Sequence, residues 1–175
     1  VARAGAFGES TNFRIARVQL GGERADVRGN EEAARRITWE VRQRTNIETS
    51  APPAPVRLDD PALFESPFLY WRGETSFEPL SEAEIIGLRR FLEFGGFLLV
   101  DELTNAFGES VRRALARALP RAQPRALGAD HVLYRSFYLI DRPVGRVLGD
   151  ETMDHIALDD RVAVVLSTQD LGGAW

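Results

Sequence analysis

Residues 81–102, SEAEIIGLRRFLEFGGFLLVDE, place the pattern of a complete helix directly before that of a complete strand. Ser81 and Glu84 have the spacing of a capping box, and apolar residues recur at helical intervals behind them until Gly95-Gly96 ends the helix. The following Phe97–Val100 is apolar without alternation, which is typical of a parallel strand buried on both faces. A helix that leads into a fully buried strand predicts an α/β fold.

The rest of the chain continues this alternation of strands and helices. We predict helices over 30–45 and 111–119, an extended proline-rich connector over 51–55, and strands over 13–20, 56–58, 67–71, 132–139 and 161–166. Strands separated by helices imply right-handed crossovers, so we expect a mostly parallel sheet with helices on both faces.

In such sheets, ligands bind beyond the carboxyl ends of the strands. Three polar stretches follow predicted strands in this chain, namely Gly73-Glu74, Asp101-Glu102 and 167–170. Asp101 and Glu102 are the leading candidates, because a carboxylate at the end of an apolar strand can be desolvated and shifted in pKa for acid–base work or metal binding. The alternative is structural: each carboxylate caps a helix or meets one of the many Arg residues.

Asp130-His131 is a second candidate, since an imidazole beside a carboxylate can act as a ligand, as a base or only as a structural hydrogen-bonding group. If Asp101, Glu102 and His131 converge, the set suits Mg²⁺, Mn²⁺ or Zn²⁺. Their spacing is not in itself a metal motif. His155, in an acidic stretch, is expected to be structural.

Tyr70-Trp71 offers an aromatic face for a sugar ring or a partner, although aromatic residues in strands more often belong to the core. Trp71 is expected nearer the rim of the sheet, because Arg72 and Gly73 end the strand there. It is therefore a candidate ligand-binding residue.

Composition excludes several functions. The sequence has 175 residues, no Cys, and 22 basic residues that are all Arg, which excludes thiolate and lysine chemistry. A net charge of −4 argues against nucleic acid as a partner. No apolar run approaches the roughly 20 residues of a membrane span. Serine-hydrolase, phosphate-loop and dinucleotide-binding motifs are not found.

Several stretches together resemble the bacterial family known as domain of unknown function 4159. They are Phe13–Arg17, Asp60-Pro61, Pro67–Tyr70, Leu88–Leu92 leading into Gly95–Asp101, Asp130-His131, Ser136–Tyr138 and Arg161–Val165. The resemblance implies a flavodoxin-like, three-layer fold similar to class I glutamine amidotransferases. It also implies export or membrane attachment, so a periplasmic or membrane-associated location is favoured, with the cytoplasm as the alternative, and cell-envelope proteins are expected partners.

Two departures from these relatives bear on function. Asp101-Glu102 stands where amidotransferases carry a cysteine, so glutamine hydrolysis by that route is excluded. Glu74 follows Gly73 where the family commonly shows histidine, and a glutamate there could ligate a metal or accept a hydrogen bond. Residues 1–175 are expected to form one amidotransferase-like domain, with part of the functional unit continuing beyond Trp175.

Three functions fit these observations. The first is a non-catalytic binding or interaction domain of the cell envelope, with Glu74, Trp71 and Asp130 as candidate ligand-binding residues. The second is a metal-assisted hydrolase that uses Asp101, Glu102 and His131, with Glu74 nearby. The third is a carbohydrate-binding or carbohydrate-processing domain, which depends on Tyr70-Trp71.

Overall fold

The parallel sheet and its covering helices are present in a computed structural model, which describes residues 13–20, 30–49, 53–135, 139–140 and 142–175. The elements are β1 (Ile15–Val18), α1 (Asn30–Arg44), β2 (Ala54–Val56), η1 (Pro61–Glu65), β3 (Phe68–Gly73), α2 (Glu82–Glu93), β4 (Phe97–Glu102), α3 (Asn105–Ala118), β5 (Arg125–Ala126), η2 (Val132–Tyr134), β6 (Asp154–Leu158), β7 (Arg161–Ser167) and α4 (Leu171–Ala174). The short η1 and η2 are 3-10 helices.

The strands form one seven-stranded sheet in the order β2-β1-β3-β4-β7-β6-β5. The first five in this order are parallel, whereas β6 runs antiparallel to both β7 and β5. Counted along the chain, the five parallel strands have the order 2-1-3-4-5, which is the flavodoxin-like order. The predicted mostly parallel α/β fold is confirmed.

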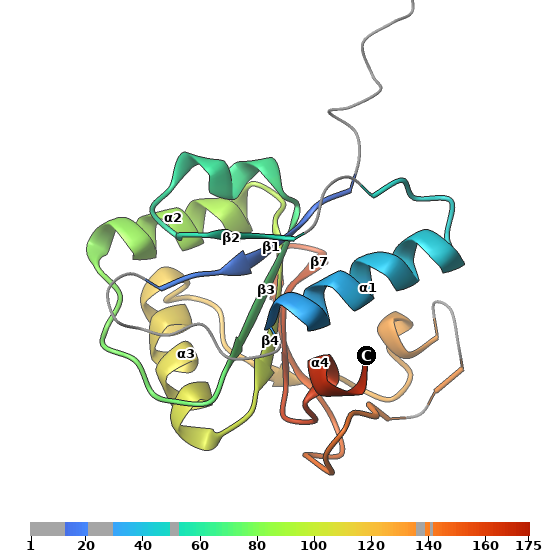
Figure 1. Ribbon diagram of the computed structural model, residues 1–175. Coiled ribbons are helices and arrows are strands. Elements are labelled where there is room, and N and C mark those ends of the chain that lie inside the picture. The colour runs from blue at the N-terminus through green and yellow to red at the C-terminus, as the bar shows by residue number, and fades with distance from the viewer. Residues whose placement is uncertain (1–12, 21–29, 50–52, 136–138, 141) are drawn as a thin grey trace, which may run out of the picture.

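Helices cover both faces of this sheet, so the molecule has three layers (Figure 1). On one face, Ala33 and Ala34 of α1 pack with Tyr70, Leu99 and Val165, and Leu171 of α4 joins them. On the other face, α2 and α3 pack on the larger core, which contains the alternate residues of the same strands. This alternation fixes which side chains of each strand face which helices.

The helix and strand over 81–102 form as the sequence predicts. Ser81 Oγ accepts a hydrogen bond from the Glu84 amide at 3.3 Å, and Glu84 Oε2 accepts one from the Ser81 amide at 2.8 Å, so the capping box is complete. Gly95 adopts φ 106°, a conformation that favours glycine, directly after the helix.

The strand predicted over 132–139 is wrong at its start, because residues 132–134 form η2, and 136–138 lie outside the described residues. For residues 121–160 the sequence otherwise indicates only loops and short strands. One of these short strands is Asp154–Leu158, which forms β6 and pairs with β7 across a tight turn where Asp159 has φ 51°. Pairing with β7 determines the structure of this segment, because five residues carry little pattern of their own.

β2 spans Ala54–Val56, whereas we predicted a connector over 51–55 and a strand over 56–58, so the strand begins and ends two residues earlier than predicted and includes Pro55. A proline is tolerated because β2 is the edge strand of the sheet. Among the helices of the described residues, none has the length and apolar character needed to cross a bilayer.

Candidate functional site

Buried polar side chains gather at the carboxyl ends of β3, β4 and β7, where the sequence places a ligand site. The polar residues here that are less than a tenth exposed are Arg72, Asp101, Glu102, Ser167, Gln169 and Asp170. In Figure 1, β3 and β4 run downward, and α4 lies beside their lower ends. Each of these side chains must find a partner inside the protein, since water does not reach it.

Asp101 is fully buried and anchors the start of α4. Its Oδ1 accepts a hydrogen bond from the Leu171 amide at 3.0 Å, and its Oδ2 accepts one from the Gly172 amide at 2.8 Å. The Tyr70 hydroxyl also donates to Oδ2, at 2.9 Å. Three internal donors therefore occupy this carboxylate.

The pKa of Asp101 reflects two opposing effects. Burial raises the pKa of Asp101 above its usual value, while the hydrogen bonds from Gly172, Leu171 and Tyr70 favour the charged form and limit the rise. Burial and the charge of Asp101 in turn raise the pKa of Tyr70, so its hydroxyl stays protonated and donates. This is the electrostatic pattern of a structural carboxylate held by donors.

Asp170 is the second buried carboxylate on this face, and it begins α4 in a left-handed conformation with φ 54°. Arg72 Nη2 donates to Asp170 Oδ1 at 2.9 Å, Arg146 donates to Oδ2, and the Gly173 amide caps Oδ1 at 3.0 Å. Burial favours the neutral carboxyl, but the bonds from Arg72 and Arg146 outweigh it and hold the pKa of Asp170 below its usual value.

Arg72 connects the two carboxylates, because its Nε also lies 3.7 Å from Asp101 Oδ2. Tyr70 and Arg72 are two residues apart in β3 and so share a face of the sheet. The result is a buried network of Tyr70, Arg72, Asp101 and Asp170 that holds α4 against the sheet. We call these four residues the α4 anchor.

Glu102 faces the opposite side of the sheet from Asp101, as successive strand residues do. Its two oxygens both lie 2.6 Å from Arg112 Nη1 of α3, and Arg112 Nη2 also bonds Asp154 of β6 at 3.1 Å. Burial raises the pKa of Glu102, and Arg112 opposes the shift. A Cβ added at Gly108 would lie 2.2 Å from Glu102 Oε2, so glycine makes room for this carboxylate.

The other predicted site residues lie apart from Asp101. His131 caps η2, where its Nδ1 accepts a hydrogen bond from the Leu133 amide at 3.2 Å, and Asp130 is exposed in the preceding turn. The Glu74 side chain is exposed, and its carbonyl oxygen accepts a bond from Thr104. Asp101, Glu102 and His131 are each bonded to separate partners. Within the described residues, no three His, Asp or Glu side chains gather as metal ligands.

Trp71 does not lie at the rim, which corrects the expectation from Arg72 and Gly73. It is 2% exposed and packs in the core against Phe77 and Phe107, with ring centroids 5.2 and 6.0 Å away. The chain after β3 brings Phe77 over the end of the strand and covers Trp71.

Sequence reasoning identified the buried end of β4 but missed the partners of Asp101. The sequence suggests a role for the aromatic ring of Tyr70, but it does not show that the Tyr70 hydroxyl bonds Asp101. The signal for Asp170 is an Asp immediately before the short Leu171–Ala174 stretch, which is a helix-capping position. No local pattern joins residues 70, 101 and 170, because only the parallel register brings them together.

Comparison with known proteins agrees with the resemblance seen in the sequence. No curated protein matches the chain. The family model described as "Domain of unknown function (DUF4159)" matches residues 14–175, which include β1 through α4. The chain therefore belongs to the DUF4159 family.

Proposed function

We propose that this chain is a non-catalytic binding domain of the bacterial cell envelope. The observation that carries the non-catalytic part is the α4 anchor, in which Asp101 and Asp170 hold the last helix through hydrogen bonds to its amides. The envelope location draws support from the family resemblance, whose members tend to be exported or membrane-attached.

The chemistry of the strand ends supports this proposal. A base or a metal ligand must offer a free lone pair, and an acid must offer a proton, to its substrate or ion. Asp101 directs its oxygens to Tyr70, Leu171 and Gly172, and Glu102 directs both of its oxygens to Arg112. Releasing Asp101 for a ligand would leave buried donors unpaired, at a cost of about 1–3 kcal/mol each.

The competing function is a metal-assisted hydrolase, and one set of titrations separates it from the proposed function. Calorimetry with Mg²⁺, Mn²⁺ and Zn²⁺ is run on the native chain, on Asp101→Asn, and on Asp160→Asn as a control for an exposed carboxylate. The same three proteins are assayed with nitrophenyl esters and nitrophenyl phosphates. We expect neither cation binding nor hydrolysis that depends on Asp101. Metal binding or turnover that is lost in Asp101→Asn and kept in Asp160→Asn would overturn the proposal.

The envelope location is tested separately by fractionating cells that produce the full natural protein. We expect the protein in the periplasmic or membrane fraction. Recovery in the cytoplasmic fraction would contradict this part of the proposal.

A further inference from the structure

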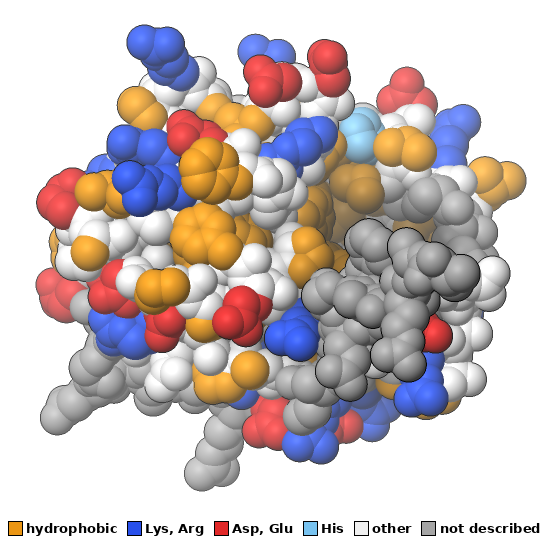
Figure 2. Space-filling model, turned by 90° about the horizontal axis from the view of Figure 1, so that it is seen from above, with side chains coloured by type: hydrophobic (Ala, Val, Ile, Leu, Met, Phe, Trp, Pro, Cys, Tyr) orange, Lys and Arg blue, Asp and Glu red, His pale blue; other side chains and the backbone are white. Residues whose placement is uncertain are grey.

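A pocket of about 610 Å³ lies at the other end of the sheet, where α2 and α3 end and β6 turns into β7. Arg161, at the start of β7, links this turn to the end of α2, because it donates to the carbonyls of Leu92 and Gly96. Hydrophobic side chains gather on the face shown in Figure 2, and the surface beside a histidine is hollowed. The volume is within the range of about 300–1,000 Å³ that is typical of small-molecule sites.

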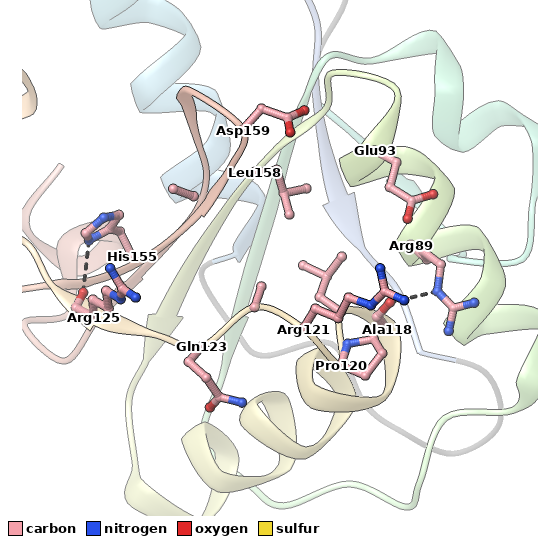
Figure 3. A pocket seen from close by; sticks show the side chains of 13 residues that line it. Arg89, Glu93, Ala118, Pro120, Arg121, Gln123, Arg125, His155, Leu158 and Asp159 are labelled. Atoms are coloured by element: carbon pink, nitrogen blue, oxygen red, sulfur yellow. Dashed lines mark hydrogen bonds between the residues drawn. The ribbon is translucent and has the colours of Figure 1, made fainter.

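The pocket combines an apolar floor with charged walls. Leu119 and Leu158 are among the apolar lining residues, and Leu119 is 5% exposed. Figure 3 shows Arg125 and His155 on one side of the pocket and Arg89, Arg121 and Glu93 on the other. A ligand seated here would bury an apolar body and meet charges at its ends.

Arg121 and Arg125 are available to a ligand. Both are exposed, and within the described part of the chain neither side chain has a hydrogen bond or an ion pair. A guanidinium stays charged at every physiological pH and matches the geometry of a carboxylate or phosphate group. Two such groups, four residues apart on the segment that joins α3 to β5, line the pocket from opposite sides (Figure 3).

Arg89 lies on the same side of the pocket as Arg121, but it is already hydrogen-bonded. Its Nε donates to the Ala118 carbonyl at 2.7 Å and its Nη2 to the Arg117 carbonyl at 3.1 Å, so it caps the C-terminal end of α3. Its charge has no carboxylate partner within the described residues. Arg89 therefore lines the pocket as a fixed cation.

His155 connects the segment that carries Arg125 to the sheet. Its Nδ1 lies 2.9 Å from the Arg125 carbonyl oxygen, which can only accept, so Nδ1 carries the proton and donates. This bond joins β5 to β6 and fixes the backbone from which Arg125 projects. The His155 ring also lies 5.9 Å from that of His131, between centroids.

Glu93 and Asp159 line the pocket as well, and they restrict the ligand. In Figure 3 both carboxylates lie toward the upper side, away from Gln123 and Arg125. Within the described residues neither forms an ion pair with the pocket's Arg side chains. They would repel a ligand with negative charge along its whole length, so a single anionic group at one end fits best.

We propose that this pocket binds a small organic anion, with a carboxylate or phosphate monoester group between Arg125 and Arg121, which line opposite sides of the pocket, and an apolar body over Leu119 and Leu158. The inference rests on the proposed binding function and gives it a site and a ligand class. It is independent of the α4 anchor, which lies at the opposite end of the strands.

The test uses amide chemical-shift titrations of the native chain with 4-phenylbutyrate and phenyl phosphate as probes. Benzyl alcohol is the neutral control for each. We expect both anions to shift the amides of residues 119–126 and 155–159, and to bind roughly tenfold more tightly than the alcohol, as expected for charge-assisted hydrogen bonds. A preference for one anion over the other identifies a carboxylate or a phosphate as the natural group.

Variants make the test specific. Arg121→Gln with Arg125→Gln should weaken anion binding at least tenfold, whereas Arg90→Gln, an exposed Arg of α2 outside the pocket, should leave it unchanged. Glu93→Gln should strengthen binding by a few fold, and this exposed helix position keeps the test valid if the double variant does not fold. Absence of anion-induced shifts in the native chain, or equal binding by all four proteins, would overturn the inference.

These outcomes are distinct from those that test the proposed function. Hydrolysis or metal binding that depends on Asp101 would overturn the non-catalytic proposal, but it would not affect the result of the anion titration at the pocket. An inert Asp101 together with no anion binding would defeat only the inference about the pocket.

Discussion

Two buried aspartates on the same face of the sheet have opposite pKa shifts, and their partners explain the difference. Asp170 bonds two guanidinium groups, which hold its pKa below the usual value. Asp101 bonds only neutral donors, with Arg72 at 3.7 Å, so burial dominates and raises its pKa. The two groups therefore contribute to stability with opposite dependence on pH.

Comparing the native chain with Asp170→Asn as a function of pH should show how much the charge of Asp170 contributes to the free energy of unfolding. The depressed pKa of Asp170 means that its stabilisation is fully present above the unfolded value of about 3.8 and is lost as pH falls through the lower folded value. Asparagine also tolerates the left-handed conformation and caps helices, so mainly the charge is removed.

We expect the native chain to exceed Asp170→Asn by about 3 kcal/mol in free energy of unfolding near pH 7, with the difference shrinking below about pH 4. Urea denaturation from pH 2.5 to 7 measures this difference in free energy of unfolding. Asp101 is present in both proteins, so the contribution of its titration largely cancels in the difference. A difference that stays constant over this range would show that Arg72 and Arg146 do not act through the charge of Asp170.

Tyr70→Phe should remove one donor to Asp101 and leave the ring in place against Trp175, whose centroid is 5.6 Å away. The expected loss in free energy of unfolding is about 1 kcal/mol. Combining it with Asp101→Asn should give less than the sum of the two losses, because both substitutions act on the same bond, which a neutral amide accepts less strongly than a carboxylate. Strict additivity in the denaturation midpoints would contradict the direct bond.

The short helix α4 depends on contacts distant in sequence. Four residues are too few to be a stable helix alone, so its stability comes from the bonds of its amides to Asp101, from packing on α1 and from the adjacent cap Asp170, which Arg72 and Arg146 hold in place. In contrast, α2 carries its own capping box and apolar stripe, which is why the sequence predicts α2 well and gives little sign of α4. The sequence does not locate β6 for the same reason, since pairing with β7 determines its structure.

Gly172→Ala tests how closely α4 packs on the sheet. A Cβ at Gly172 would lie 2.1 Å from the Tyr70 hydroxyl oxygen and 2.9 Å from Ala33 Cβ, so α4 or Tyr70 must move. We expect a loss of about 1–3 kcal/mol in free energy of unfolding, measured by urea denaturation. Ala174→Ser, at an exposed position of the same helix, is the control and should change stability by less than about 0.5 kcal/mol. Equal stabilities for both variants would mean that α4 does not pack closely there.

Across the whole molecule, the two ends of the parallel strands have different roles. The carboxyl ends carry buried, paired charges that hold the chain together. The pocket near the amino ends is lined by Arg side chains, of which Arg121 and Arg125 have no hydrogen-bond or ion-pair partner within the described residues. The sequence predicts the buried position of Asp101 from the apolar strand before it. It does not predict the pocket, because Arg125 and His155 come together only through the pairing of β5 with β6, and that pairing has no local pattern.

The central claim is that Asp101 binds the start of α4 and not an external ligand. Amide hydrogen exchange at Leu171 and Gly172 tests it most directly, in the native chain and in Asp101→Asn, each with and without Mg²⁺ or Zn²⁺. We predict that the substitution speeds exchange of at least one of these amides by roughly tenfold or more, and that neither cation changes exchange in the native chain. Unchanged protection in Asp101→Asn, or native amides released by the cation, would contradict the claim.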